Sequence, residues 1–304
     1  MSKVAQIYPK LEYVWTLENI SANLARKFMS GCKIILPAQI RGRSVDDVFE
    51  IFMEHLDELH EIYELLIDED SKKTFCGYWL GCITNQISSV VYAKTPQYIC
   101  QGFLPKTGDI VIDCGSYDGA TAVRFVNMGC EVYSFEMNKT NYERAAKLAT
   151  EKNFVVENLG LGSLKHTANY TPNGGATQID MHGSESAQIT TIDSYVGEKN
   201  IPHVDFIKMD VEGAELDILK GAAITIAKFK PILALSAYHK LDDFWTLTKF
   251  IKSIRPDYEF GLRQFATTPE DMTDWFPKNL IELLEAFGLE INLPNYEECV
   301  LFAR

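Results

Sequence analysis

The sequence predicts an α/β protein whose core is a parallel, doubly wound, Rossmann-like sheet, preceded by a mostly helical region. From Gly108 onward, short apolar runs alternate with segments of helical spacing, and such alternation gives parallel strands joined by right-handed crossovers. Before about residue 100, the periodicity is helical only. Sheets of this class bind ligands beyond the carboxyl ends of their strands, where the strand order reverses.

Residues 1–100 are expected to form the helical region. An acidic residue three positions after Ser44 indicates a helix start, and apolar residues then recur on one side up to Leu66. A second helix is expected from Asp70 to about Thr84. No linker marks the end of this region, so residues 101–304 are assigned to the sheet domain. The helical region is expected to form a dimer contact or one wall of the substrate pocket.

The alternating region is expected to have five main strands, at 109–113, 131–135, 154–157, 205–209 and 231–236. The helices between and after them are expected to end at Met128 and to span 139–152, 214–227 and 242–254. Residues 160–192 interrupt this rhythm, with extended segments at 164–170 and 187–192 around a turn at 172–175. A last strand pair, 259–263 and 299–303, flanks an insertion of about 265–297. That insertion is expected to contain a helix at Asn279–Phe287 and to be able to cover the substrate.

Composition limits the possible partners. The formal net charge is -13 and no cluster of Lys and Arg is found, which argues against nucleic acid and against an anionic membrane surface. The seven cysteines are scattered and form no Cys-x-x-Cys pair, so a reducing compartment is expected. Because neither a signal peptide nor a transmembrane run is found, the expected location is cytoplasmic. An acidic chain is compatible with a neutral small substrate and a cationic cofactor.

The strongest local feature is the run Asp113-Cys-Gly115-Ser116-Tyr-Asp118-Gly119, at the end of one expected strand and the start of a helix. Glycines there let the backbone approach a ligand, and free N–H groups at the helix start can bind a carboxylate. The Gly-x-x-x-Gly spacing differs from the Gly-x-Gly-x-x-Gly of a dinucleotide site. It suits a bound amino acid better than a pyrophosphate.

Glu136 ends the next expected strand. A carboxylate in this place can accept hydrogen bonds from both ribose hydroxyls of a nucleoside. Its other interpretation is a surface residue at a strand end. The glycine turn and the acidic residue together predict a nucleoside-type cofactor.

The run DFIKMDVEGAE, residues 205–215, ends a buried strand with two carboxylates, Asp210 and Glu212. Asp210 is expected to face the reacting part of a ligand. Glu215 is interpreted as an acidic residue that favours a helix N-terminus. His239 lies at the end of the following strand, where it could be a structural hydrogen-bonding group or a base. No metal motif is found, because Asp210 with His239 gives only two ligands, and no metal is expected.

Four runs in this order, GDIVIDCGSYDGATAVRF, VYSFEMN, ITTIDSYV and DFIKMDVEGAELDILKGA, resemble the FkbM family of S-adenosylmethionine (SAM)-dependent methyltransferases. The likeness extends from about Phe103 to Lys252, and ECVLFA fits the closing strand. The DVEGAE block is its most specific part. The resemblance implies a seven-stranded class I methyltransferase sheet and methyl transfer to a hydroxyl of a small molecule, sugar-like or polyketide-like.

The resemblance also implies roles for single residues. Asp113, Gly115, Ser116 and Gly119 would frame the methionine part of SAM, Glu136 would bind its ribose, and Asn158 would lie near its adenine. Asp210 would lie beside the methyl group and His239 near the acceptor, and either could be the base. The chain departs from the family at 263–265, where Arg-Gln-Phe replaces an Arg-His-Tyr-like run, and in the long insertion that follows.

The sequence is also compatible with two other functions. A non-catalytic SAM-binding or interaction module would use the N-terminal helices as its working surface. An NAD-dependent oxidoreductase is disfavoured by the glycine spacing. The chain could also form a homodimer.

Overall fold

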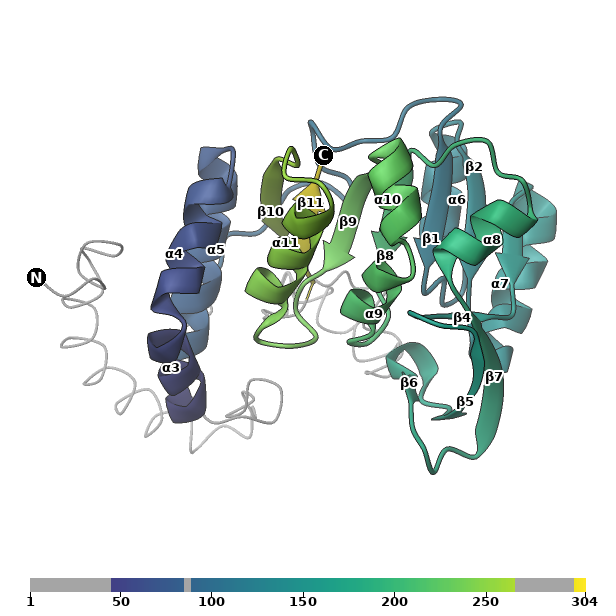
Figure 1. Ribbon diagram of the computed structural model, residues 1–304, viewed down its shortest axis with the longest axis horizontal. Coiled ribbons are helices and arrows are strands. Elements are labelled where there is room, and N and C mark those ends of the chain that lie inside the picture. The colour runs from purple at the N-terminus through teal and green to yellow at the C-terminus, as the bar shows by residue number, and fades with distance from the viewer. Residues whose placement is uncertain (1–44, 85–88, 266–297) are drawn as a thin grey trace, which may run out of the picture. The chain divides into compact units, whose positions relative to one another are not determined.

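The computed structural model describes residues 45–84, 89–265 and 298–304 (Figure 1). These residues form two compact units, one from 45–96 with 262–265 and 298–299, the other from 97–261 with 300–304. The predicted helix at Asn279–Phe287 and nearly all of the predicted insertion lie outside the described residues.

The first unit is helical, with α3 (Val45–Glu54), α4 (Leu56–Leu65) and α5 (Glu69–Thr84). The prediction of one helix from 45 to 66 was wrong at His55, whose backbone leaves the helical region at φ -111° and ψ 24°. Hydrogen bonds from His55 N to Ile51 O and from Leu59 N to His55 O cross this break, so the apolar side continues. The side chains buried along it are Val48, Phe52, Leu59 and Ile62.

Arg263 ties the 262–265 segment to the start of α5. Its guanidinium donates to Ser71 Oγ at 2.7 Å and lies 3.2 Å from Asp68 Oδ1. The backbone N–H of Leu262 donates to the same Ser71 oxygen at 2.9 Å. Arg263 therefore has a structural role within this unit.

A seven-stranded sheet forms the core, in the order β10-β11-β9-β8-β1-β2-β3. Its strands are β1 (Ile110–Cys114), β2 (Glu131–Phe135), β3 (Val155–Glu157), β8 (Phe206–Met209), β9 (Ile232–Ser236), β10 (Phe260–Gln264) and β11 (Cys299–Ala303). The pairs β1–β2, β1–β8, β2–β3 and β8–β9 are parallel, whereas β11 runs antiparallel to β9. The predicted fold class is confirmed.

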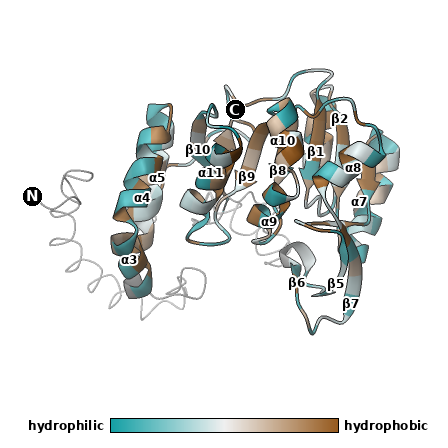
Figure 2. Cartoon of the chain, viewed as in Figure 1, coloured by the Kyte–Doolittle hydropathy of each residue, from teal (hydrophilic) through white to brown (hydrophobic). Residues whose placement is uncertain are grey.

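Helices cover both faces of this sheet (Figure 1). One layer holds α6 (Ala120–Asn127) and α7 (Lys139–Lys152), and the other holds α8 (Ile192–Glu198), α9 (Glu215–Lys220), α10 (Ala223–Phe229) and α11 (Asp243–Ile254). Every residue of β1 and β8 is therefore buried, as in parallel strands covered on both sides, and Figure 2 shows the apolar colour concentrated there. The rings of Phe125 and Phe206, 5.2 Å apart, join α6 to β8.

The predicted helix 214–227 was wrong in being continuous, because it divides into α9 and α10 around Gly221. A Cβ at Gly221 would lie 2.1 Å from the carbonyl oxygen of Gly162, so the backbones are in direct contact there. Asp193 then caps α10 by accepting hydrogen bonds from the N–H groups of Ile224 and Thr225. Tertiary contacts, which the periodicity does not show, break the helix.

The predicted extended segment 187–192 was wrong at its last residue. Ile192 begins α8, because the Thr191 hydroxyl caps that helix by accepting from Ser194 N at 3.0 Å.

A second, four-stranded sheet occupies the region that interrupts the strand–helix rhythm. Its order is β4-β7-β5-β6, and the strands are β4 (Gly160–Leu161), β5 (His166–Thr171), β6 (Gln178–Ile179) and β7 (Glu185–Thr190). Its loop at Gly174 lies beside the start of α7, where Asn141 Nδ2 donates to Gly174 O at 2.9 Å. Asn138 Nδ2 donates to Thr177 Oγ1 at the same distance. This sheet therefore borders the loop after β2 and the start of α7.

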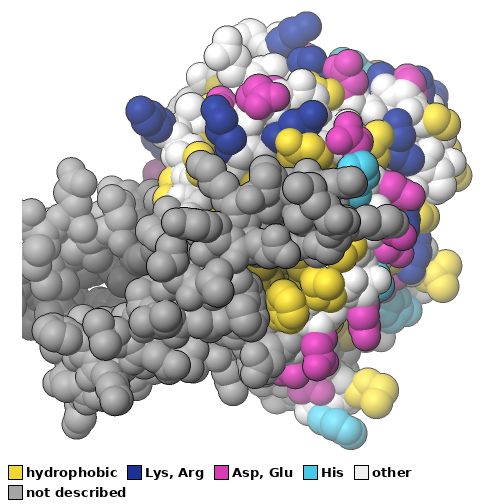
Figure 3. Space-filling view, turned by 90° about the vertical axis from the view of Figure 1, so that its left-hand side faces the viewer, with side chains coloured by type: hydrophobic (Ala, Val, Ile, Leu, Met, Phe, Trp, Pro, Cys, Tyr) yellow, Lys and Arg dark blue, Asp and Glu magenta, His cyan; other side chains and the backbone are white. Residues whose placement is uncertain are grey.

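The described helices include none that is both long and apolar enough to cross a lipid bilayer. The cysteines among the described residues are free thiols. On the face shown in Figure 3, Lys and Arg side chains are interspersed with Asp and Glu and form no separate basic patch.

Candidate active site

The carboxyl ends of β1, β2 and β8 meet at one edge of the sheet. Beyond β1, the N–H groups of Gly115 and Ser116 both donate to Phe135 O, each at 3.0 Å. On the other side, Asp210 N donates to Cys114 O at 3.0 Å. The strand order reverses at β1, which is where such sheets bind ligands.

Two glycines shape the turn between β1 and α6. Gly115 has φ +79°, and a Cβ there would lie 1.9 Å from the carbonyl oxygen of Asp210. Gly119 has φ +89° and begins α6 as its N-cap. Only glycine adopts such angles without strain, so this turn presents backbone rather than side chains to a ligand.

Asp113 supports the turn from inside the protein. Its carboxylate is fully buried, with Oδ1 3.1 Å from Lys208 Nζ and Oδ2 accepting from Ser134 Oγ at 2.9 Å. Lys208 in turn donates to Gly115 O at 2.6 Å. Burial alone would lower the pKa of Lys208, but Asp113 and then Asp210 outweigh it, so that pKa is raised and the ammonium stays charged.

Glu136 lies at the end of β2, and both of its oxygens face backbone donors. Oε2 accepts from Tyr117 N at 2.9 Å and Oε1 from Asn138 N at 2.8 Å. Burial raises its pKa to about 7, although these two hydrogen bonds oppose the shift. Asn158 follows β3, and its amide donates to the carbonyl oxygen of Glu136 at 2.8 Å.

Ser116 has a buried hydroxyl next to this turn. The side chain is almost fully buried, and Oγ has no hydrogen-bond partner among the described residues. Buried hydroxyls are normally hydrogen-bonded, so this oxygen indicates a ligand contact in the cradle.

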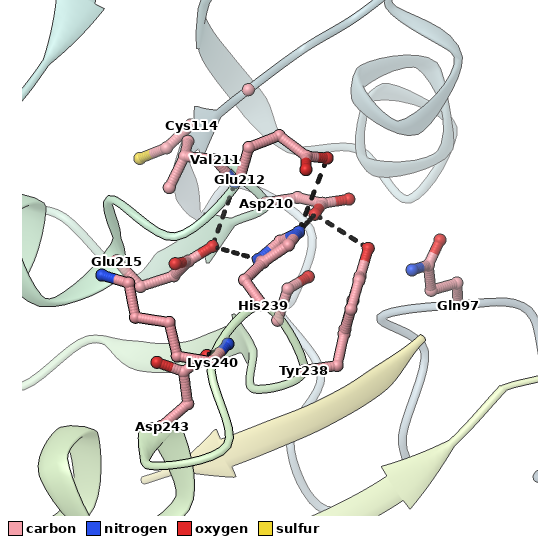
Figure 4. A network of polar contacts seen from close by, with 12 residues as sticks. Gln97, Cys114, Asp210, Val211, Glu212, Glu215, Tyr238, His239, Lys240 and Asp243 are labelled. Atoms are coloured by element: carbon pink, nitrogen blue, oxygen red, sulfur yellow. Dashed lines mark hydrogen bonds and ion pairs between the residues drawn. The ribbon is translucent and has the colours of Figure 1, made fainter. Parts of the chain in front are cut away.

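The second half of the site lies at the ends of β8 and β9, and it includes Asp210 (Figure 4). Its Oδ2 accepts from Tyr98 Oη at 2.8 Å and its Oδ1 from Tyr238 Oη at 3.2 Å. Burial would raise the pKa of Asp210, but the charges of Lys208 and His239 and the Tyr98 hydrogen bond lower it. The side chain is therefore an ionised, partly exposed carboxylate held in a fixed orientation.

His239 lies among three carboxylates (Figure 4). Its Nδ1 is 2.7 Å from Glu215 Oε1, and its Nε2 is 3.6 Å from Asp210 Oδ1 and 3.5 Å from Glu212 Oε1. Burial would lower the pKa of His239, but the carboxylates of Glu212 and Glu215, and then that of Asp210, raise it to about 10. Glu215 begins α9, as expected from the sequence, and also orients this imidazole.

Comparison with known protein families matches residues 113–279 to the "Methyltransferase FkbM domain" family, more than half of the 304 residues. The chain belongs to this family. FkbM methyltransferases are of the SAM-dependent class, and the unpartnered Ser116 hydroxyl, the glycine turn and Glu136 fit that cofactor.

Two relatives resemble this FkbM-family chain. "Hexuronic acid methyltransferase AglP" of Haloferax volcanii is 28% identical over 119 residues, 37% of this chain and 49% of the relative. The crystal structure of methyltransferase FkbM from Methylobacillus flagellatus KT superposes with a TM-score of 0.67 at 22% identity, over 88% of this chain and 62% of that one. The matched part is thus about half of the length of the AglP relative, and the structural likeness shows the fold.

Sequence reasoning missed three residues of this FkbM-family site. Lys208 carried a signal, because a lysine inside an apolar strand is rarely buried without a partner. Tyr98 carried none, because it lies 112 residues from Asp210 in the chain. Tyr238 stands next to His239, but spacing alone does not show that its hydroxyl faces Asp210.

Proposed function

We propose that this chain transfers a methyl group from SAM to a hydroxyl oxygen of a sugar-like small molecule. The main support for this proposal is the position of Asp210 beside the glycine turn. Asp210 has an ionised carboxylate and lies at the end of β8, and its backbone carbonyl oxygen is 1.9 Å from where a Cβ of Gly115 would be. A proton acceptor thus stands next to the cofactor cradle. The likeness to a hexuronic acid methyltransferase favours a sugar-type acceptor.

SAM would be held by the 115–119 turn, Ser116 and Glu136, and when bound it supplies an electrophilic methyl group on a sulfonium. Asp210 would accept a hydrogen bond from the acceptor hydroxyl and take its proton as the new bond forms. The Tyr98 and Tyr238 hydroxyls fix the direction of its oxygens, which matters because methyl transfer depends on in-line positioning.

The division of roles between Asp210 and His239 follows from charge. With a pKa of about 10, the His239 imidazole is protonated at neutral pH and cannot take a second proton. Asp210 is therefore proposed as the base, and His239 as the residue that positions it.

Replacement of Asp210 and His239 tests this division. Release of the demethylated product, S-adenosylhomocysteine (SAH), is measured with neutral sugars, sugar acids and polyketide alcohols as acceptors. We expect Asp210→Asn to reduce turnover about 10²–10⁴-fold while SAH still binds, because general base catalysis contributes about that much. His239→Asn should reduce turnover by a smaller factor. Asp217→Asn, which removes a carboxylate from the exposed side of α9, is the matched control. Turnover near wild type in both site variants would contradict the assignment.

A further inference from the structure

The side chains of Asp210, Glu212 and His239 converge from two neighbouring strand ends. Asp210 and Glu212 follow β8, whereas His239 follows β9. One carboxylate oxygen from each acidic residue and one imidazole nitrogen lie within 4.8 Å of one another (Figure 4). The sequence suggested only the pair Asp210 and His239. Glu212 joins them because its backbone takes a left-handed conformation, with φ 55°, in the turn before α9.

The distances in this cluster suit a shared ion better than direct hydrogen bonds. His239 Nε2 lies 3.6 Å from Asp210 Oδ1 and 3.5 Å from Glu212 Oε1, which is longer than an N–H···O hydrogen bond. Two ligands that are each about 2.1 Å from one ion lie roughly 3.0–3.4 Å apart in octahedral or tetrahedral geometry. For the two pairs that involve His239 Nε2, a shift of a few tenths of an ångström would give this spacing.

His239 itself points to a ligand. Its side chain is only 5% exposed, and Nε2 has no hydrogen-bond partner among the described residues although it faces both carboxylates. Buried ring nitrogens are normally hydrogen-bonded or coordinated. The buried Nε2 is an observation separate from the acidic cluster, because it concerns a ring nitrogen without a hydrogen-bond partner.

The surroundings hold the three side chains in place. Glu215 Oε1 pairs with His239 Nδ1 at 2.7 Å, which keeps a proton on Nδ1 and points Nε2 toward the other two carboxylates. A cation bound there would displace the proton that Nε2 carries in its absence. A carboxylate on the second ring nitrogen is the usual support of a metal-bound histidine. Val211 N holds Glu215, and two tyrosine hydroxyls hold Asp210.

The two lysines near this cluster, Lys208 and Lys240, have other partners. The Lys208 ammonium pairs with Asp113 and donates to Gly115 O, while Lys240 Nζ donates to Gly213 O. Three carboxylates thus surround one imidazole, and a divalent cation would balance their charge.

We propose that Asp210, Glu212 and His239 bind one divalent cation of the Mn²⁺ type, and that the open coordination positions take the acceptor oxygen. Two carboxylates and one imidazole suit Mn²⁺, whereas Ca²⁺ and Mg²⁺ take mainly oxygen ligands and structural Zn²⁺ sites favour Cys and His. A coordinated hydroxyl loses its proton more easily, so a weakly basic Asp210 would suffice. This role rests on the proposed function, but binding of the ion does not.

Mn²⁺ alone is the probe, added to the 304-residue chain without SAM. Calorimetry should show one Mn²⁺ per chain. Pulsed electron paramagnetic resonance, by electron spin echo envelope modulation, should show a nitrogen hyperfine coupling on the bound ion, from His239 Nε2. Glu212→Gln should weaken Mn²⁺ binding by about 100-fold or more, since even residues behind the ligands change metal affinity by about 10–100-fold. Asp217→Asn, the matched loss of one exposed carboxylate, should leave it unchanged, and His239→Asn should remove the nitrogen coupling.

Absence of a Mn²⁺ site in the wild-type chain, or a bound ion without nitrogen coupling, would overturn the proposal. So would equal Mn²⁺ affinity in the Glu212→Gln and Asp217→Asn variants. The wild-type spectrum shows whether Mn²⁺ binds with a nitrogen ligand even if a variant fails to fold. A parallel SAH titration separates the two proposals: SAH binding without Mn²⁺ overturns only the metal site, and Mn²⁺ binding without SAH overturns only the proposed function.

Discussion

The two halves of the ligand-binding edge are built in different ways. At the ends of β1 and β2, the acidic side chains have fixed protein partners: Asp113 pairs with Lys208, and Glu136 accepts from two backbone N–H groups. At the ends of β8 and β9, His239 is crowded by carboxylates and keeps an unpartnered nitrogen. The first half is a preformed cradle, whereas the second concentrates charge that a ligand must complete. Perturbed charges of the second kind are typical of sites of chemistry.

The halves are joined by Lys208, so its loss should have the largest effect. Lys208→Met leaves the Asp113 carboxylate buried without its cation, and breaking a buried ion pair destabilises a protein by about 3–5 kcal/mol. Chemical denaturation of Lys208→Met should show a loss of that size. Lys220→Met, at an exposed pair, is the matched control and should change little. Equal stability of the two variants would mean that the halves are not coupled through Lys208.

Gly115 is the second point of contact between the halves. An alanine Cβ would lie 1.9 Å from Asp210 O, so Gly115→Ala should displace the turn and weaken SAH binding about 100-fold, or about 2.7 kcal/mol. Gly108→Ala has the same kind of left-handed backbone, φ +90°, but open space around it. We expect it to lose only stability, about 1–3 kcal/mol, and to keep SAH affinity in calorimetry. The same loss of affinity in both would show that strain, not the contact with Asp210, is responsible.

Glu136 allows the cradle to be tested by pH. Its pKa of about 7 makes the carboxyl neutral at pH 5.5 and ionised at pH 8, and the ionised form accepts two ribose hydroxyls better. SAH affinity should therefore rise about tenfold between these pH values. The Glu136→Gln variant should bind SAH weakly, with the same affinity at both pH values. Glu131→Gln, at the exposed start of β2, should keep the wild-type slope. A slope that persists in Glu136→Gln would assign the titration to another group.

The sequence predicted the cradle better than the charged half, for a physical reason. A glycine turn between a strand and a helix is a local feature, so the residues from Asp113 to Gly119 could be placed from spacing alone. The contacts of Asp210 with Tyr98 and of Glu215 with His239 join distant parts of the chain, and only the folded sheet brings them together.

The errors in secondary structure have the same origin. Periodicity predicted a continuous helix over 214–227, but the backbone contact between Gly221 and Gly162 and the cap from Asp193 divide it. The Thr191 cap, which starts α8, overrides the extended pattern before it. Capping and close backbone contacts depend on single residues, and a periodic pattern does not register them.

The cofactor preference of this edge is tested by a calorimetric titration of SAH and of NADH into the wild-type chain. If the edge at Gly115, Ser116 and Glu136 is a SAM cradle, one SAH should bind per chain and NADH should not. Binding of NADH without SAH, or of neither, would show that this edge is not a SAM cradle.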